Sequence, residues 1–353
     1  MFMDRRRLLT LSLLSGASPL LGSADAGKKI RIGQIGTGHA HAGGKMSALR
    51  SLSDLYEVVG LVEPDPERRR TAEKSATYAG LSILTEEELL SMPNLAAVAV
   101  ETDIAQSAAT ALRCLRAGKH VHLDKPGALD HHRFKNMRNE AQERGLTVQM
   151  GYMLRYNPAF EFLFRVVREG WLGEITEIDA AMGKLADDRT RSALRSLPGG
   201  GMFELACHVI DAVVTLLGRP NSVHATSTPT RTDGMKDNQT ALLQYAKATA
   251  VIRCNHADPF GGRRRRFMVA GTEGVIDIQP LESGKFSLSL TSAREKWKKG
   301  TQTVTLPVPQ GRYDREFMDL AEIIQGRKKL SWDAAHDIAV HETVMLASGQ
   351  LIA

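Results

Sequence analysis

The chain has 353 residues, of which 42% are hydrophobic and 24% charged. These proportions are near the averages for folded soluble proteins and exclude collagen-like, disordered and multi-span membrane chains. The net charge of +6 is compatible with nucleic-acid binding, but aromatic residues make up only 5% of the chain, so we expect no nucleic-acid partner.

The three cysteines, Cys114, Cys207 and Cys254, are odd in number and far apart. This spacing favours neither a disulfide framework nor a paired-cysteine metal site. We therefore expect buried free thiols and no bound metal.

Residues 1–26 have the form of a signal peptide. Arg5 to Arg7 precede an apolar stretch from Leu8 to about Leu21, and Ala24 to Ala26 form an A-x-A cleavage pattern. The stretch is shorter than the roughly 20 residues that span a bilayer, so we expect its removal and no membrane contact afterwards. The arginines resemble a twin-arginine signal, and a general secretory signal is the alternative. Either signal predicts a periplasmic or otherwise exported protein.

The segment that follows is typical of a dinucleotide-binding unit. Apolar residues alternate from Lys28 to Ile35, which predicts a buried strand, and the chain then enters the turn Gly36–His41. Gly36 would make the tight turn, and Gly38 would let backbone amides approach a pyrophosphate at the helix N-terminus. The third fingerprint position holds His41 instead of a small residue, so the glycines alone are weak support.

A second predicted strand, Tyr56–Glu63, ends in a carboxylate. We expect Glu63 to bind the hydroxyls of the adenosine ribose, where its charge would repel a 2′-phosphate and favour NAD. Arg68, Arg69 and Arg70 keep NADP open, although a solvated helix face is the simpler interpretation.

The strand and helix pattern continues through residues 95–100, a helix to Ala117, and residues 119–123. It predicts an α/β fold with a doubly wound parallel sheet. Lys125 would lie at the carboxyl edge of that sheet, where ligands bind.

Ala117–Pro126, which reads AGKHVHLDKP, resembles the AGKHVxxEKP segment of the Gfo/Idh/MocA (glucose–fructose oxidoreductase/inositol dehydrogenase) family. Three later segments resemble that family in order and spacing: Gly151–Pro158, Trp171–Ile175 and Gly199–Asp211. The resemblance implies an NAD(P)-binding Rossmann domain over 27–150. It also implies a substrate-binding and oligomerisation domain over 151–353, α+β with an open, largely antiparallel sheet, and hence a homo-oligomer.

The chain departs from the family pattern at four positions. Asp124 and Glu204 exchange one carboxylate for another, Ala206 replaces a glycine, and Asp103 stands where proline is usual. The cofactor-binding residues expected from the pattern and the resemblance together are Gly36, Thr37, Gly38, His39, Glu63, Thr102, Asp124 and Lys125.

Met202–Leu217 reads as one helix with Glu204, His208 and Asp211 on one face. Burying these three polar side chains without partners would cost free energy, so their presence on an otherwise apolar helix needs an explanation. A core network around His208, a metal site through Glu204 and His208, and a catalytic acid–base pair all remain open, and we favour the last.

Removing a hydride from an alcohol carbon requires a group that takes the hydroxyl proton, and the pKa of imidazole suits this task. We therefore assign His208 as the base, with Glu204 orienting it and Lys125 polarising the substrate oxygen. The family resemblance assigns the matching Lys and His to this work. Substrate contacts are expected from Arg155, Tyr152 and Asp211, although a structural role is equally open for the first two.

The remaining chain predicts strands within 239–254, 266–270 and 274–278. The segment 312–326 and a helix within 332–349 are expected to close the fold back onto the body. The charge run Gly261–Arg266 is interpreted as a solvated loop or edge strand, with attraction of acidic sugars or polymers as the alternative.

An exported Rossmann enzyme has no obvious pool of free cofactor, so we expect tightly held NAD, or NADP, that is regenerated within each cycle. The predicted function is an NAD(P)-dependent oxidoreductase that acts on a carbohydrate. The alternatives are an NAD-dependent glycosidase that works by transient oxidation and elimination, and a non-catalytic Rossmann-type binding protein.

Overall fold

The computed structural model describes residues 28–350. The predicted signal peptide, residues 1–26, lies outside the described residues. None of the helices within 28–350 has the length and apolar character that a membrane span requires.

Five parallel strands form the first sheet, in the order β2-β1-β3-β4-β5. Their bounds are β1 Ile30–Ile35, β2 Tyr56–Val62, β3 Leu95–Val100, β4 His120–Leu123 and β5 Val148–Met150. Parallel sheets are covered on both faces, which explains why most residues of these strands are apolar and buried. The associated helices are α1 Ala42–Ser51, α2 Pro66–Glu73, α3 Glu86–Ser91, α4 Ile104–Arg116 and α5 His131–Glu143. The predicted α/β fold with a doubly wound parallel sheet is confirmed.

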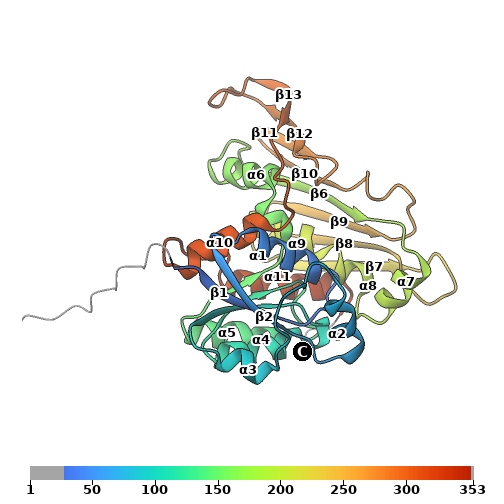
Figure 1. The fold of residues 1–353 in the computed structure, drawn as a ribbon. Helices are drawn as coiled ribbons and strands as arrows, with labels where there is room; N and C mark the ends of the chain where they lie inside the picture. Colours follow the sequence, from blue (N-terminus) through green and yellow to red (C-terminus); the bar gives the residue numbers. More distant parts are fainter. Residues whose placement is uncertain (1–27, 351–353) are drawn as a thin grey trace, which may run out of the picture.

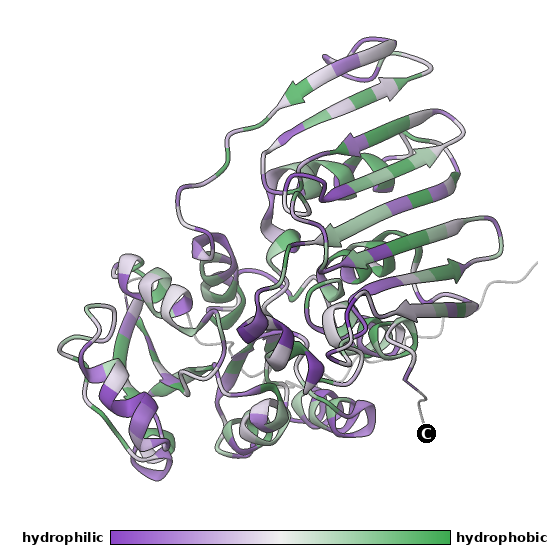
Figure 2. Ribbon diagram, turned by 90° about the vertical axis from the view of Figure 1, so that its right-hand side faces the viewer, coloured by the Kyte–Doolittle hydropathy of each residue, from purple (hydrophilic) through white to green (hydrophobic). Residues whose placement is uncertain are grey.

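Eight strands form the second sheet, in the order β13-β12-β11-β10-β6-β9-β8-β7. Their bounds are β6 Ile175–Gly183, β7 Ser222–Thr228, β8 Asn238–Gln244, β9 Thr249–Asn255, β10 Arg266–Gly271, β11 Gly274–Ile278, β12 Lys285–Leu290 and β13 Gly300–Thr305. All neighbours are antiparallel except β6 and β9. Figure 2 shows these strands side by side in one open sheet, as the family resemblance implied.

Helices cover one face of the second sheet, where buried residues alternate with more exposed ones along each strand. The helices after β5 are the 3₁₀ helix η1 Met153–Tyr156, α6 Pro158–Arg168, α7 Asp188–Arg195, α8 Gly200–Glu204, α9 Cys207–Leu217, α10 Asp314–Ile324 and α11 Ala334–Ala347.

The last two helices close back onto the body of the fold, as predicted (Figure 1). On α10, Phe317 and Leu320 share a hydrophobic cluster with Ile32 of β1 and Leu49 of α1. The Tyr56 hydroxyl donates a hydrogen bond to the Phe317 carbonyl at 2.6 Å, and α11 packs against α5. The first sheet therefore depends on residues from the far end of the chain.

The single helix predicted over Met202–Leu217 is wrong, because α8 ends at Glu204 and α9 begins at Cys207. The carbonyl oxygen of Glu204 accepts a hydrogen bond from Lys125 Nζ at 2.7 Å, so it is used outside the helix. Glu204 and His208 therefore lie on two different helices and not on one face of a single helix.

The arginine-rich run leads into β10, which lies between β6 and β11 and is not an edge strand. Three of the four arginines in the run are paired with carboxylates: Arg264 with Asp258, Arg265 with Glu282 and Arg266 with Asp277. The loop interpretation therefore fits residues 261–265, and the edge-strand interpretation does not.

Candidate active site

The glycine turn after β1 is shaped by close backbone packing. Gly36 has a φ of +90°, and a Cβ there would lie 2.8 Å from the backbone of Thr102, so a side chain is excluded. The Gly36 amide donates to the Val62 carbonyl at 2.7 Å, and the His39 amide donates to the Glu101 carbonyl at 2.9 Å. Two predicted cofactor residues, Gly36 and Thr102, are therefore in contact at the carboxyl edge of the sheet.

Glu63 follows β2 and is fixed beside this turn. The amide and hydroxyl of Thr37 both donate to its Oε2 at 2.6 Å, and the Asp65 amide donates to its Oε1 at 3.0 Å. Glu63 is buried. The structure thus brings the predicted ribose-binding carboxylate to the glycine turn.

An ion pair lies directly over Gly38. Arg68 and Asp103 form two hydrogen bonds of 2.7 and 3.0 Å, and a Cβ on Gly38 would lie 2.5 Å from Arg68 Nη1. Arg69 Nε donates to the Glu63 carbonyl at 2.9 Å. The arginines of α2 are therefore more than a solvated face, because two of them contact the predicted nucleotide site.

A buried group of titratable side chains lies between the glycine turn and the end of β4. Asp124 Oδ2 is 3.3 Å from His39 Nδ1 and 3.0 Å from His41 Nδ1. The Lys125 amide donates to Asp124 Oδ1 at 2.7 Å. Burial lowers the pKa of His39 to about 4 against the opposing effect of Asp124. Burial, and then the charge of Asp124, raises the pKa of Glu101 well above its usual value.

Lys45 of α1 extends this group to α10. It is fully buried, forms an ion pair with Glu316, and lies 3.9 Å from Asp124 Oδ2. Burial raises the pKa of Glu316 to about 7, although the charge of Lys45 opposes this shift. Sequence reasoning missed Lys45 and Glu316, which are 271 positions apart and carry no motif.

Lys125, which follows β4 of the first sheet, pairs with Glu204 at the end of α8. Lys125 Nζ donates to Glu204 Oε1 at 2.7 Å. Burial by itself would lower the pKa of Lys125, but the Glu204 carboxylate outweighs burial and raises it. Burial would raise the pKa of Glu204, but Lys125 lowers it to about 2. At neutral pH the pair is therefore a cation and an anion.

His208 lies in the first turn of α9 and is 2% exposed. Burial, followed by the charge of Lys125, lowers its pKa well below the usual value, so the ring is neutral at pH 7. Within residues 28–350 its Nδ1 has no hydrogen-bond partner. The Tyr152 ring packs edge to face against it, with centroids 6.0 Å apart. His208 thus offers a free, neutral nitrogen near the charge of Lys125.

Arg155 and Asp211, both predicted substrate contacts, form a buried ion pair instead. Arg155 Nη2 is 2.6 Å from both Asp211 Oδ1 and Asp337 Oδ1, and Arg138 lies 2.9 Å from the other oxygen of Asp337. The Arg155 guanidinium also lies over the Tyr152 ring, 4.8 Å from its centroid. This pairing favours the structural interpretation of Arg155 that the sequence left open.

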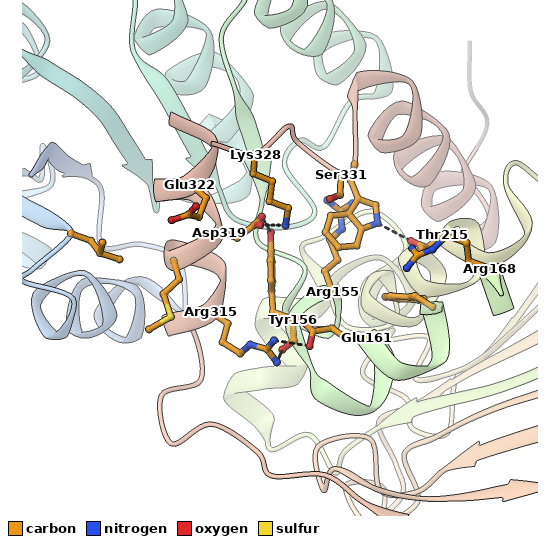
Figure 3. Close-up of a pocket in the computed structure, with 14 residues that line it drawn as sticks. Arg155, Tyr156, Glu161, Arg168, Thr215, Arg315, Asp319, Glu322, Lys328 and Ser331 are labelled. Atoms are coloured by element: carbon orange, nitrogen blue, oxygen red, sulfur yellow. Dashed lines mark hydrogen bonds and ion pairs between the residues drawn. The ribbon is translucent and has the colours of Figure 1, made fainter. Parts of the chain in front are cut away.

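A cavity of about 770 Å³ lies beside Arg155, between η1, α6, α10 and the start of α11. Figure 3 shows Arg315 directed at Glu161 and Lys328 directed at Asp319 along its wall. Its lining contains neither Lys125 nor His208. It is therefore separate from the predicted catalytic groups.

Family models match both halves of the chain. The model described as "Oxidoreductase family, NAD-binding Rossmann fold" matches residues 30–152. The model described as "GFO/IDH/MocA C-terminal domain" matches residues 160–277.

Similar proteins include pig trans-1,2-dihydrobenzene-1,2-diol dehydrogenase, which is 31% identical over 54% of this chain and 57% of its own length. The bovine enzyme of that name is 30% identical over 45% of this chain and 48% of its own length. The chain thus spans only about half the length of these curated relatives. A scyllo-inositol 2-dehydrogenase (NADP(+)) of Bacillus subtilis is 24% identical over 77% of this chain and 81% of its own length.

Solved structures share the fold. A levoglucosan dehydrogenase, in complex with NADH and levoglucosan, superposes with a TM-score of 0.77 at 19% identity, covering 91% of this chain and 98% of the other.

Proposed function

The chain belongs to the GFO/IDH/MocA family of oxidoreductases, and from this premise we propose that it is an NAD(P)-dependent enzyme that oxidises an alcohol group of a sugar or polyol. The observation that carries the proposal is the pairing of a buried, charged Lys125 with Glu204, close to a neutral His208. The names of the relatives, which include dehydrogenases of a diol, an inositol and a sugar derivative, agree with this substrate class.

The glycine turn fits a dinucleotide. Gly36 has no room for a side chain, Gly38 lies under the Arg68–Asp103 ion pair, and Glu63 is held beside the turn by Thr37. We favour NAD over NADP because the Glu63 carboxylate would repel a 2′-phosphate. Arg68, which could bind that phosphate, is already engaged by Asp103. A bound nicotinamide would supply the hydride acceptor.

The protein groups have separate tasks in the proposed reaction. Lys125 stays protonated and donates a hydrogen bond to the substrate oxygen, which stabilises charge that develops there. His208 is neutral and accepts the hydroxyl proton. Glu204, predicted to orient His208, is bonded to Lys125 instead, so its role is to position that ammonium group.

Tyr152 supports the His208 ring from one side, and the Arg155–Asp211 pair lies behind Tyr152. We assign positioning roles to these three residues, because Arg155 and Asp211 are engaged with each other and Tyr152 packs against both Arg155 and His208.

Export, retention of the cofactor, the oligomeric state and the domain bounds are also proposals. Residues 1–26 support export, and export in turn supports a tightly held cofactor. The face of the second sheet left uncovered by this chain's helices supports a homo-oligomer. We retain 27–150 as the nucleotide-binding domain and 151–353 as the substrate-binding domain.

The test is to purify the full chain, denature it and identify any released nucleotide by mass spectrometry. Oxidation of sugars and polyols by the intact protein is then followed through NADH absorbance with added NAD. Lys125→Ala should lower kcat by at least ~10²-fold while the protein remains folded. The control is Lys298→Ala, which removes an exposed lysine remote from the site.

Undiminished turnover in Lys125→Ala would overturn the assigned mechanism. A chain that neither releases nor binds a dinucleotide would instead favour a non-catalytic binding protein.

A further inference from the structure

We propose that His39, His41 and Asp124 bind one divalent transition-metal ion of the Zn²⁺ class. His39 Nδ1, His41 Nδ1 and an Asp124 oxygen lie within 4.8 Å of one another, which places three different donors around one point. We refer to these residues, with Glu101, as the loop-histidine cluster.

The distances match a shared metal ion. Ligand atoms at about 2.0–2.1 Å from a tetrahedral Zn²⁺ are separated from each other by about 3.3 Å. Asp124 Oδ2 lies 3.3 Å from His39 Nδ1 and 3.0 Å from His41 Nδ1. Little rearrangement is therefore needed, although the bond of 3.3 Å from the His41 amide to His39 Nδ1 would be lost.

The donor set selects the class of ion. Two imidazole nitrogens and one carboxylate suit Zn²⁺, Co²⁺ or Fe²⁺, whereas Mg²⁺ and Ca²⁺ prefer oxygen ligands. The Asp124 carboxylate is also held in place by a second hydrogen bond. The Lys125 amide donates to its Oδ1 at 2.7 Å, and its Oδ2 lies near both histidines. Such outer hydrogen bonds are typical of metal-binding carboxylates.

Glu101 provides a second, independent observation. It is fully buried, its Oε2 is 3.7 Å from His39 Nδ1, and neither of its carboxyl oxygens has a hydrogen-bond partner within residues 28–350. A buried carboxyl group without a partner is costly, and a cation in the cluster would supply one. The nearby Lys45 does not fill this role, because its closest partner is Glu316.

The cluster can be reached from solvent. The side chains of His41 and His39 are 16% and 7% exposed, so an ion could enter from the side of the glycine turn. The site needs no dinucleotide, and its test is therefore independent of the proposed oxidoreductase activity.

The experiment is a titration of the untagged full chain with Co²⁺, followed by visible absorption. We expect one equivalent of Co²⁺ to bind with the strong bands of a four-coordinate site, and Zn²⁺ to abolish them. His41→Asn and His39→Asn should each weaken Co²⁺ binding by at least ~10-fold.

The matched control is His131→Asn. His131 and His341 also bring two Nδ1 atoms within 3.2 Å of each other, but without a carboxylate at that contact. This variant should bind Co²⁺ like the wild type. Thermal melting checks that each variant is folded.

Absence of saturable Co²⁺ bands in the wild type would overturn the proposal, whatever the variants do. Equal Co²⁺ binding by wild type and both folded loop-histidine variants would overturn it as well.

Discussion

The cluster around Arg155 and the loop-histidine cluster contain similar buried groups, but they differ in how the charges are paired. In the first, Arg155 and Arg138 face the carboxylates of Asp211 and Asp337, two cations against two anions. In the second, Asp124 is shared between two histidines, and Glu101 has no hydrogen-bond partner within residues 28–350.

The difference separates two uses of buried charge. The ion pairs of the first cluster join η1, α5, α9 and α11, and each of its two carboxylates has at least one cationic partner. An incomplete set beside a glycine turn retains polar atoms that a ligand or ion could satisfy, and such groups cluster at functional sites. The sequence left a substrate contact and a structural role equally open for Arg155, and predicted a substrate contact for Asp211.

The largest expected effect comes from breaking the paired cluster. Arg155→Met leaves the carboxylates of Asp211 and Asp337 buried with fewer partners, so we expect the free energy of unfolding to fall by ~3–5 kcal/mol. Urea denaturation measures this loss. Arg168→Met is the control, because Arg168 lines the same cavity without a partner in that cluster, and it should change stability by less than ~0.5 kcal/mol. A loss below ~1 kcal/mol in Arg155→Met would contradict the structural role.

The second effect is a dependence on pH. His39 has a folded pKa of about 4 against an ordinary value of 6.5, so the unfolded chain binds more protons between these values. Stability from this residue is present above pH 6.5 and is lost as the pH falls toward 4, by an amount of about 2–3 kcal/mol.

Urea denaturation of wild type and His39→Asn from pH 4.5 to 7, both in chelator, measures the contribution of His39. We expect the stability of His39→Asn to fall less steeply with acidification. Parallel pH profiles of the two proteins would refute the assignment. Burial would raise the pKa of Asp211, but Arg155 and His336 together lower it, so this carboxylate stays ionised across the range.

The smallest expected effect is on stability, when a carboxylate in each cluster is replaced by the corresponding amide. Glu101→Gln replaces a carboxyl group that lacks a partner, so without metal we expect a change in stability within ~1 kcal/mol. Asp337→Asn removes a charge that pairs with Arg155 and Arg138, and it should cost at least ~2 kcal/mol. Equal losses in the two variants would mean that the clusters do not differ in pairing.

Local patterns in the sequence predicted much of the fold and part of the site. The apolar runs predicted the strands of the first sheet, and the glycine turn and the end of β2 predicted the meeting of Gly36 with Glu63. Lys125 was predicted at a strand end for the same reason, because the carboxyl ends of parallel strands share one edge.

Contacts between distant segments were not predictable in this way. The bond from Lys125 to Glu204 joins residues 79 positions apart, and it accompanies the helix break that the apolar pattern concealed. The loop-histidine cluster depends on β4 lying two strands from β1. The local signal that could have suggested this cluster was the pair His39 and His41, which are separated by one residue and follow Gly38.

The packing of α10 on the first sheet has a consequence for biosynthesis. All five strands of that sheet leave the ribosome within the first 150 residues, but Phe317 and Leu320 follow much later. Until then the nascent chain exposes Ile32 and Leu49, an apolar surface that favours aggregation. Synthesis of this protein therefore includes a long interval in which part of the core beside the first sheet is uncovered.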